Sequence, residues 1–377
     1  MLAPTDYTEQ GGLYIGFDLK IHNVGDDSDG PKRFYSDMSI WDTFRTEHPW
    51  LALIRPQEAT DVIRSMLMIY KQAGYLPKWP LAFGETDTMI GTHAQAVIAD
   101  AYAKGIRDFN LQLAYEAMYQ CSTQPQSHAG RTDLGNWSTP GYVTSEAADD
   151  SAPLTEEYAF DDWCVAKFAE ALGYESEAKM FYNRSQNYRN TWSSQHQIFC
   201  PRSSSGEFDC PVAWDNVFDE RYVEGDAWHW RWFVPHDVPG LIELFGSTEN
   251  FLEELTFFFD MSEEHRSNFM PDPYFWAGNE HDLFAPYMFS WVGRNDLTQK
   301  YARWNLENRH TTNPDGLPGN DDYGTMSAWV MFNMLGFYPL AGSDLYILSS
   351  PVFPQVSIQL PSGGVLNIIA HQASQDN

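Results

Sequence analysis

Residues 319–329 read Gly-Asn-Asp-Asp-Tyr-Gly-Thr-Met-Ser-Ala-Trp, an acidic turn that runs directly into an apolar segment. Behind the turn, apolar residues recur at the spacing that places them on one face of a helix: Met326, Trp329, Val330 and Met334. The pattern predicts a helix over 325–335 that presents the turn at its N-terminus. Two interpretations of the turn stay open, because Asn and Asp side chains cap such helices and also bind ligands there.

The same alternation of loops and helices runs through most of the chain. Apolar periodicity predicts helices over 57–73, 93–104, 110–120, 155–172, 176–191, 239–245, 248–261, 283–292, 297–308 and 325–335. Helix hairpins joined alternately by tight turns and by long aromatic loops favour a mainly α fold, an α/α toroid. An α-solenoid, the alternative, would repeat with a fixed period of roughly 30–45 residues, which the sequence does not show.

Short strand-like segments lie at both ends of the chain, over 13–21, 345–348, 355–360 and 365–370. We therefore expect a β segment or linker over 1–33, a helical barrel that carries the site over 34–337, and the truncated start of a C-terminal β domain over 338–377. The strand at 13–21 follows no segment with which it can pair. This suggests a piece of a longer protein, with 1–33 as the remnant of an N-terminal domain, or an isoform that lacks this domain.

Composition restricts the function. The 377 residues carry a net charge of −29, which argues against nucleic acid and against an anionic lipid surface as partners. An acidic chain suits a neutral or cationic ligand, and a cation such as calcium. Aromatic residues make up 15% of the chain, and rings beside acids suit sugars, whose C–H faces stack on rings while their hydroxyls bond to carboxylates. The sequence holds no run of about 20 apolar residues that would predict a membrane span.

Cysteines and glycosylation motifs bear on the compartment. Cys200 and Cys210 flank a polar segment, and two alternatives stay open for them: a disulfide or two free buried thiols. The sequons that begin at Asn136 and Asn183 are compatible with secretion. The start of the chain lacks the features of a signal peptide. We expect the full-length protein to be extracellular.

Several loops carry candidate binding residues. Asp42 and Arg45 can grip vicinal hydroxyls, or can form an ion pair that caps a helix. Lys78 and Trp79 lie in a stiff aromatic loop that binds a ligand or packs in the core.

Glu224 lies among aromatic residues, where burial would raise its pKa and suit it to donate a proton; the alternative is a solvated glutamate before a helix. The other candidates precede helices, where capping is the alternative: His236, Asp237, Asn279 and Glu280. If the loops converge at one mouth of the toroid, Glu224 and Asp322 supply the two carboxylates that glycoside hydrolysis requires.

A series of motifs occurs in a fixed order along the chain: Ser39–Arg45, Leu76–Pro80, Tyr158–Trp163, Glu224–Trp228, Val234–Leu241, Gly278–Glu280 and Asp315–Asp322. With these motifs the chain resembles the family 92 glycoside hydrolases, calcium-dependent exo-α-mannosidases, from about Phe34 to Phe353. The resemblance implies an inverting hydrolase with an (α/α)6 barrel and flanking β-sandwich material. Its substrate would be α-linked mannose of N-glycans or mannans, so a mannose-bearing oligosaccharide or glycoprotein glycan is the expected partner.

The resemblance also implies roles for single residues. Glu224 matches the general acid and Asp322 the general base, and Asn320 stands where the family often has a further aspartate beside the base. Calcium would bind near Asn279, Glu280 and Asp322. The residues expected to bind substrate are Trp41, Asp42, Arg45, Lys78, Trp79, His236, Asp237 and Glu280.

Two alternatives remain. One is another glycosidase on the same toroid, of the α-glucosidase or trehalase type. The other is a truncated, inactive fragment that still binds mannose. Because the chain lacks most of the family's N-terminal β-sandwich, we also expect an exposed apolar face through which it can associate with a partner.

Overall fold

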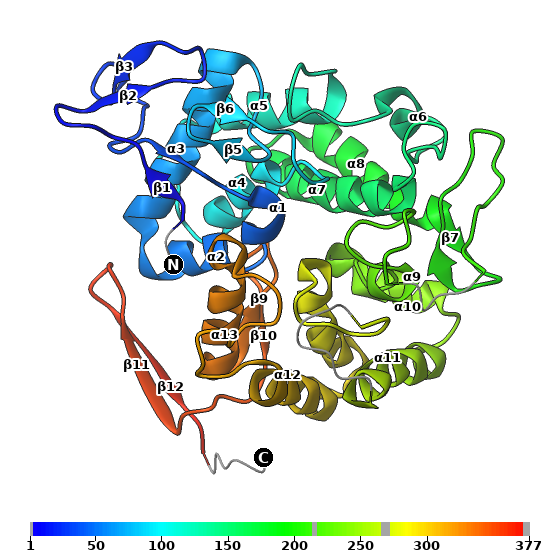
Figure 1. Ribbon diagram of the computed structural model, residues 1–377. Helices are drawn as coiled ribbons and strands as arrows, with labels where there is room; N and C mark the ends of the chain where they lie inside the picture. The colour runs from blue at the N-terminus through cyan, green and yellow to red at the C-terminus, as the bar shows by residue number, and fades with distance from the viewer. Residues whose placement is uncertain (1–2, 213–216, 265–271, 372–377) are drawn as a thin grey trace.

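Helix α13 (Thr325–Leu335) begins where the pattern predicts and closes a ring of helices (Figure 1). The computed structural model describes residues 3–212, 217–264 and 272–371. Helix α13 packs against α2 (Glu47–Ile54), so segments far apart in sequence meet. At this junction the Phe332 ring lies 5.2 Å from that of Trp50, and Thr46 Oγ1 donates to the carbonyl of Thr325 at 2.6 Å. The predicted toroid is confirmed.

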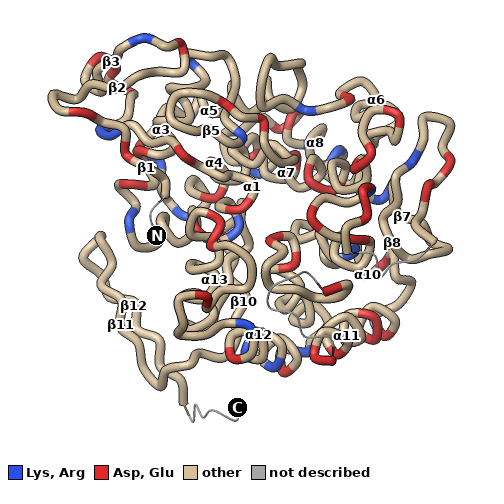
Figure 2. The backbone as a smooth tube through the Cα atoms, viewed as in Figure 1, with Lys and Arg blue, Asp and Glu red and all other residues tan. Residues whose placement is uncertain are grey.

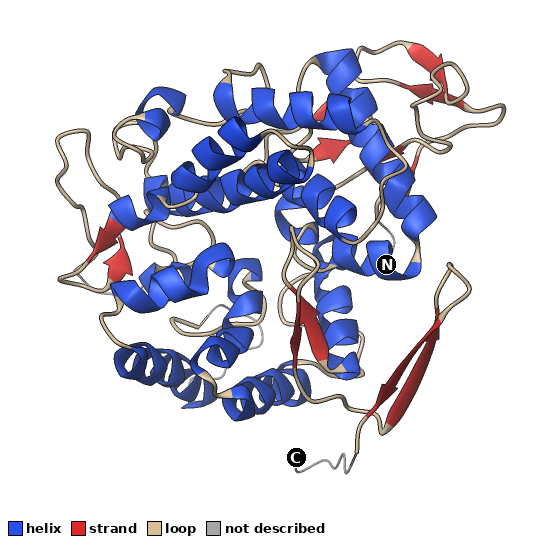
Figure 3. Cartoon of the chain, turned by 180° about the vertical axis from the view of Figure 1, so that it is seen from behind, coloured by secondary structure: helices blue, strands red, loops and turns tan. Residues whose placement is uncertain are grey.

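The ring has an inner and an outer layer of helices. Inner elements contact one another in succession: α2, α4 (Ala94–Ala103), α7 (Ser151–Ala171), α10 (Val238–Leu244) with the short 3-10 turn before it (η2, Pro235–Asp237), the 3-10 helix η3 (Glu280–Val292) and α13. Outer helices each follow an inner one: α3 (Pro56–Ala73), α5 (Leu111–Thr123), α8 (Glu175–Arg184), α11 (Thr248–Glu264) and α12 (Asn295–Arg309). Seen from behind, the chain is mostly a ring of helices with a few short strands, of which one pair lies near the middle of the view (Figure 3).

Burial explains which helices lie inside. Helix α4 consists mostly of alanine and other apolar residues and is buried along nearly its whole length, as an inner helix surrounded by others must be. Helix α8 instead buries only Ala178 and Phe181 and turns its charged residues to solvent. The two layers therefore follow from apolar pattern alone.

The sequence misses or misjudges several elements. It predicts one helix over 176–191, but the structure ends α8 at Arg184 and continues with a 3-10 turn over 187–191. The segment 283–292 forms a 3-10 helix rather than an α-helix, and Pro286 lies inside it, where it removes a hydrogen bond of an α-helix. Short helices too brief to show a period are absent from the prediction: α1 (Ile40–Thr43), α2, α6 (Leu134–Ser138) and α9 (Ala227–Trp230).

The strands form two-stranded antiparallel pairs. The prediction of one strand over 13–21 is wrong: β2 (Leu13–Ile15) pairs with β3 (Ile21–Asn23) across a turn in which Leu19 has a left-handed φ of 61°. The predicted strands at 345–348, 355–360 and 365–370 are confirmed as β10 (Tyr346–Leu348), β11 (Gln355–Gln359) and β12 (Val365–Ile369). The other pairs are β1 (Thr5–Asp6) with β4 (Tyr35–Ser36), β5 (Pro80–Leu81) with β6 (Gly84–Glu85), β7 (Trp192–Ser193) with β8 (Ile198–Phe199), and β9 (Phe337–Pro339) with β10.

The division into 1–33, 34–337 and 338–377 stays a prediction, and residues 372–377 of its last part lie outside the described residues. Of the two alternatives for Cys200 and Cys210, the structure shows the disulfide, while Cys121 and Cys164 are buried free thiols. Across the described ranges, no helix is long and apolar enough to cross a membrane. Acidic residues are spread along most of the chain rather than gathered in one run, and the hairpin of β11 and β12 carries none (Figure 2).

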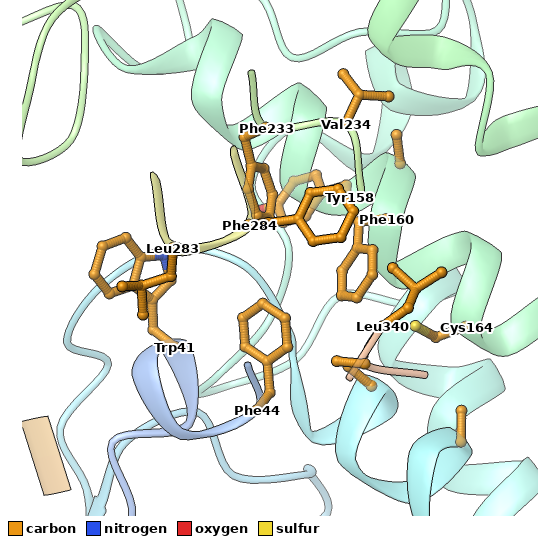
Figure 4. Close-up of a cluster of buried hydrophobic side chains, with 14 of the residues drawn as sticks. Trp41, Phe44, Tyr158, Phe160, Cys164, Phe233, Val234, Leu283, Phe284 and Leu340 are labelled. Carbon is orange, nitrogen blue, oxygen red and sulfur yellow. The ribbon is translucent and has the colours of Figure 1, made fainter. Parts of the chain in front are cut away.

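An apolar cluster fills the interior of the ring (Figure 4). Trp41 lies beside Leu283. The rings of Phe44, Phe160 of α7, Phe233 and Phe284 of η3 surround a small cavity together with Leu340. The cavity between these rings, Arg45 and Glu280 encloses about 20 Å³, which is room for one water molecule. A ligand larger than water must therefore bind beyond this cluster and not within it.

Candidate active site

The two aspartates of the acidic turn before α13, Asp321 and Asp322, have different roles. Asp321 Oδ1 accepts hydrogen bonds from the main-chain N–H of Ser327 at 3.0 Å and from its hydroxyl at 2.7 Å. Asp321 therefore caps helix α13, as the capping interpretation of the turn predicts. Asp322 and Tyr323 then adopt left-handed φ angles of 46° and 56°, an uncommon backbone for such residues. The turn directs Asp322 to a different set of partners.

Replacing the capping residue tests this division. Asp321→Ala should lower the free energy of unfolding by about 1 kcal/mol, because the first turn of α13 loses its acceptor. Asp321→Asn keeps an acceptor oxygen and should lose less. Chemical denaturation of the three proteins measures the difference, and equal stability of all three would show that Asp321 does not cap α13.

Three carboxylates from separate segments gather at one point. Asp42 comes from α1, Glu280 is the first residue of η3, and Asp322 follows the cap, and one oxygen of each lies within 4.8 Å of the others. Asp42 and Glu280 are 2% exposed. Within the described part of the chain, Asp42 Oδ2 and Glu280 Oε2 have no hydrogen-bond partner. We name Asp42, Glu280 and Asp322 the acidic cluster.

Mutual repulsion and burial dominate the electrostatics of the acidic cluster. Burial first, and then the charge of Asp322, raises the pKa of Asp42 well above its usual value. Burial, the charge of Asp42, and a hydrogen bond to Asp322 do the same for Glu280. A proton or a bound cation reduces the electrostatic repulsion between carboxylates that lie so close together. The acidic cluster therefore favours the uptake of protons or the binding of a cation.

Glu224 faces the acidic cluster from a neighbouring loop. Its φ is 49°, and the loop then enters α9, where Asp226 accepts from the N–H groups of Trp228 and His229 in a capping box. The sequence predicts a buried carboxyl, but the structure leaves Glu224 exposed. The surrounding protein still raises its pKa by desolvation, and the charge of Asp322 raises it further, against an opposing effect of Arg45. The direction of the predicted shift agrees with the structure, although the predicted burial is wrong.

Trp276 joins two of the loops that supply carboxylates, and the sequence does not reveal it. Its ring packs against Gly278 and Gly319, and a methyl group at Gly278 would overlap the ring. At Gly319 a methyl group would meet the ring at 3.2 Å, and the φ of this glycine is 68°. The available signal in the sequence was Gly278, which lies two residues after Trp276.

Trp41 and Arg45 lie behind the acidic cluster. Both are buried, and Trp41 Nε1 donates to Glu157 Oε1 at 2.7 Å. The Arg45 guanidinium packs over the rings of Trp41, Phe44 and Phe233. Both side chains therefore support the acidic cluster rather than present a surface to a sugar.

The aromatic loop at 76–80 lies beside the acidic turn, but its two candidate residues, Lys78 and Trp79, have different surroundings. The Trp79 ring meets that of Tyr323 edge-on at 6.1 Å, next to the acidic cluster. Lys78 lines a separate cavity of about 450 Å³ together with Asp87 and His128. Only Trp79 is placed to contact a ligand bound at the acidic cluster.

The remaining candidates have other surroundings. His236 Nε2 donates to the carbonyl of Ser185 at 3.0 Å, and burial lowers the pKa of His236 to about 4. Asp237 caps α10 by accepting from Gly240 N at 3.0 Å and also accepts from the Tyr188 hydroxyl at 2.7 Å. These contacts favour the capping and packing interpretations for His236 and Asp237.

The two asparagines near the acidic cluster differ in burial. Asn279 is 1% exposed, and its Nδ2 has no hydrogen-bond partner among the described residues. Its side chain does not cap η3, so the capping alternative fails for it. Asn320 is exposed at the start of the acidic turn.

Comparison with known proteins identifies a family that matches this chain. The sequence model of the glycosyl hydrolase family 92 catalytic domain matches residues 1–377. A curated protein of Arthroderma benhamiae described as an uncharacterized secreted glycosidase is 30% identical over 338 residues, which is 81% of this chain and 42% of that protein.

Solved structures agree as well. A family GH92 alpha-mannosidase from Bacteroides thetaiotaomicron is 30% identical with a TM-score of 0.89, and the match covers 99% of this chain and 49% of that one. The same enzyme, solved with mannoimidazole, gives a TM-score of 0.90. A family GH92 inverting mannosidase from the same bacterium is 27% identical with a TM-score of 0.87, over 99% of this chain and 52% of the other. The chain thus spans about half the length of the relatives it matches.

Proposed function

The chain belongs to glycosyl hydrolase family 92, and on that premise we propose that it releases terminal α-linked mannose by an inverting mechanism. The acidic cluster, faced by Glu224 with its raised pKa, is the observation that carries the proposal. Because the chain matches relatives that act on mannosides, mannose-bearing oligosaccharides of N-glycans or mannans are the proposed substrates.

Calcium fits the acidic cluster. It is a hard cation that prefers oxygen ligands, and the cluster offers three crowded carboxylates with unpaired buried oxygens. We propose that Asp42, Glu280 and Asp322 hold the ion and that Asn279 adjoins them. A bound calcium would orient the hydroxyls of a terminal sugar and withdraw electron density from them.

The chain's own carboxyls then move the protons. Glu224, protonated, donates its proton to the glycosidic oxygen as the bond to the anomeric carbon breaks. Asp322 accepts a proton from a water molecule on the opposite face of the sugar, and the water oxygen bonds to the anomeric carbon. One displacement inverts the configuration. We propose that Trp79 borders the site and that Trp41 and Arg45 hold it from behind.

The pH dependence follows from the raised pKa of Glu224. The acid must be protonated, so activity persists above the usual carboxyl pKa and falls as the pH rises through the raised value. On an aryl mannoside with a good leaving group, which needs no acid, this alkaline decline should be weaker. Profiles of kcat/KM against pH on both substrates measure it, and identical alkaline declines would exclude Glu224 as their source.

We also propose an extracellular location for the full-length protein and an apolar face through which this chain associates with a partner. The relative described as secreted supports an extracellular location for the full-length protein. Apolar side chains exposed near the N-terminus support association of this face with another domain or chain: Leu13, Ile15, Leu19, Ile21 and Phe83. We keep 34–337 as the proposed barrel domain, between β segments at 1–33 and 338–377.

The proposal is tested with α-1,2, α-1,3, α-1,4 and α-1,6 mannobioses, first with calcium and then with excess chelator. Calcium-dependent release of mannose is the expected result, and the linkage that is cleaved defines the specificity. Because the chain spans about half the length of its relatives, binding without release is the second candidate function. Binding of mannose without turnover would select it, and release from an α-glucoside alone would select the other class of toroid glycosidase.

A further inference from the structure

A row of buried side chains with alternating charge ends at the acidic cluster. His93 Nδ1 pairs with Asp161 Oδ1 at 2.8 Å, and its Nε2 pairs with Glu157 Oε2 at 2.9 Å. The other oxygen of Glu157 lies 3.6 Å from Nη2 of Arg45. Arg45 in turn interacts electrostatically with Glu280 and lines the same small cavity. We name Asp161, His93, Glu157, Arg45 and Glu280 the charge row.

The histidine of the charge row carries a positive charge at neutral pH. Burial alone would lower the pKa of His93, but the carboxylates of Asp161 and Glu157 outweigh burial and raise the pKa to about 9. Glu157 is therefore a carboxylate between two cations, His93 and Arg45. Bulk solvent does not reach this part of the row, since Glu157 is 0% exposed and His93 is 1% exposed.

Glu157 also anchors the backbone that carries Asp42. Its Oε1 accepts from Trp41 Nε1 at 2.7 Å, and Trp41 directly precedes Asp42 in the four-residue helix α1. The residue before this helix makes no capping hydrogen bond with its side chain. So short a helix is not stable by itself. The bond from Trp41 to Glu157 supplies a fixed point for it inside the ring.

We propose that Glu157 is a positioning residue that sets the cation affinity of the acidic cluster by holding the Arg45 charge away from Glu280. The inference rests on the proposed calcium site. Arg45 stands between two carboxylates, and a guanidinium that pairs with Glu280 competes with a metal ion for that carboxylate. With Glu157 negative, the Arg45 charge is compensated from behind. With Glu157 neutral, the same charge acts fully on the acidic cluster.

Helix α7 offers a matched control. Asp162 is a second buried carboxylate on this helix that bonds to a tryptophan and to arginines: Trp137 Nε1, Arg131 Nη1 and Arg184 Nε donate to it at 3.2, 2.7 and 2.7 Å. Its partners do not include Arg45 or Trp41. Asp162→Asn therefore removes a buried charge from α7 without removing a contact of Glu157, Arg45 or Glu280. Its partner Arg131 also interacts electrostatically with Asp161, at the end of the charge row far from the acidic cluster. The variant should destabilise the protein to a comparable degree.

The test compares Glu157→Gln with Asp162→Asn in the whole chain. Glutamine keeps an acceptor oxygen for Trp41 but removes the charge. Calcium is titrated into each protein by isothermal calorimetry, and the calcium-induced rise in melting temperature is recorded separately. We expect Glu157→Gln to weaken calcium binding by about tenfold or more, whereas Asp162→Asn should change it by less than about twofold.

Each outcome decides the inference. Unchanged affinity in Glu157→Gln, or equal losses in both variants, would overturn it and leave the proposed function intact. A wild-type protein that binds no calcium would overturn it together with the proposed metal site. If Glu157→Gln fails to fold, Glu157→Asp replaces it, because aspartate keeps the charge and shortens the reach to Arg45. The expected loss is then smaller but still exceeds that of Asp162→Asn, and a loss no larger than that of the control contradicts the inference.

Discussion

Replacing Glu224 by glutamine should lower kcat on natural α-mannosides by roughly 10²–10⁴-fold, because glutamine cannot protonate the leaving oxygen. Binding should change little, since glutamine has nearly the same shape and Glu224 lies outside the acidic cluster. The loss should shrink on an aryl mannoside whose leaving group departs without a proton. Steady-state kinetics on both substrates measure the difference.

Glu220→Gln is the matched control for this experiment. Glu220 is exposed and lies four residues before Glu224, so the variant tests the loss of one glutamate charge from the same segment. Its kinetics should match those of the wild-type protein. Undiminished turnover of natural substrates by Glu224→Gln would remove Glu224 from the role of acid, and an equal loss on both substrates would indicate a different role.

Replacing Asp322 by asparagine should abolish turnover for every leaving group. An amide cannot accept the proton of the attacking water, and the acidic cluster also loses one of its three carboxylates. The expected loss in kcat is again at least roughly 10²-fold and does not depend on the leaving group. This pattern distinguishes Asp322 from Glu224, whose replacement spares activated substrates.

The neighbouring residue supplies the control. Asp321→Asn makes the same chemical change one position earlier, at a side chain that bonds to Ser327 and caps α13. It should retain most of the activity. If Asp322→Asn keeps its activity on an aryl mannoside, or if Asp321→Asn loses as much as Asp322→Asn, the division of tasks in the acidic turn is wrong.

The helical ring can be predicted from sequence because its outer helices show a clear period. In α3 the buried residues recur on one face, and the predicted and observed bounds differ by one residue. Elements such as α1 escape prediction, because four residues cannot show a period. The two strands at 13–23 were predicted as one because the turn between them contains no proline and only one glycine. Leu19 in this turn has a left-handed φ, which is not expected of a leucine.

The sequence identified the acidic residues of the candidate site but not how they are arranged in space. Both Asp321 and Asp322 are acids in one turn, and only the left-handed backbone after Asp321 separates the cap from the acidic cluster. Trp41 and Arg45 lie in the correct motif, yet their burial depends on partners from α7 that are over 100 positions away in sequence, as the bond from Trp41 to Glu157 shows.

The charge row was missed because acidic residues on a helix usually face solvent. Four acids of α7 suggest a solvated face: Glu156, Glu157, Asp161 and Asp162. The structure buries all four. The available signal was that the remaining residues of α7 are mostly apolar or aromatic all around the helix, which leaves no side for solvent.

The most direct test of the account is proton NMR of the first product released from an α-linked mannobiose, recorded within the first minutes and with calcium present. The account predicts that β-mannose appears first, before mutarotation, and that a chelator stops its release. Release of α-mannose first, or release that continues unchanged without calcium, would contradict the inverting, calcium-dependent mechanism assigned to Glu224 and the acidic cluster.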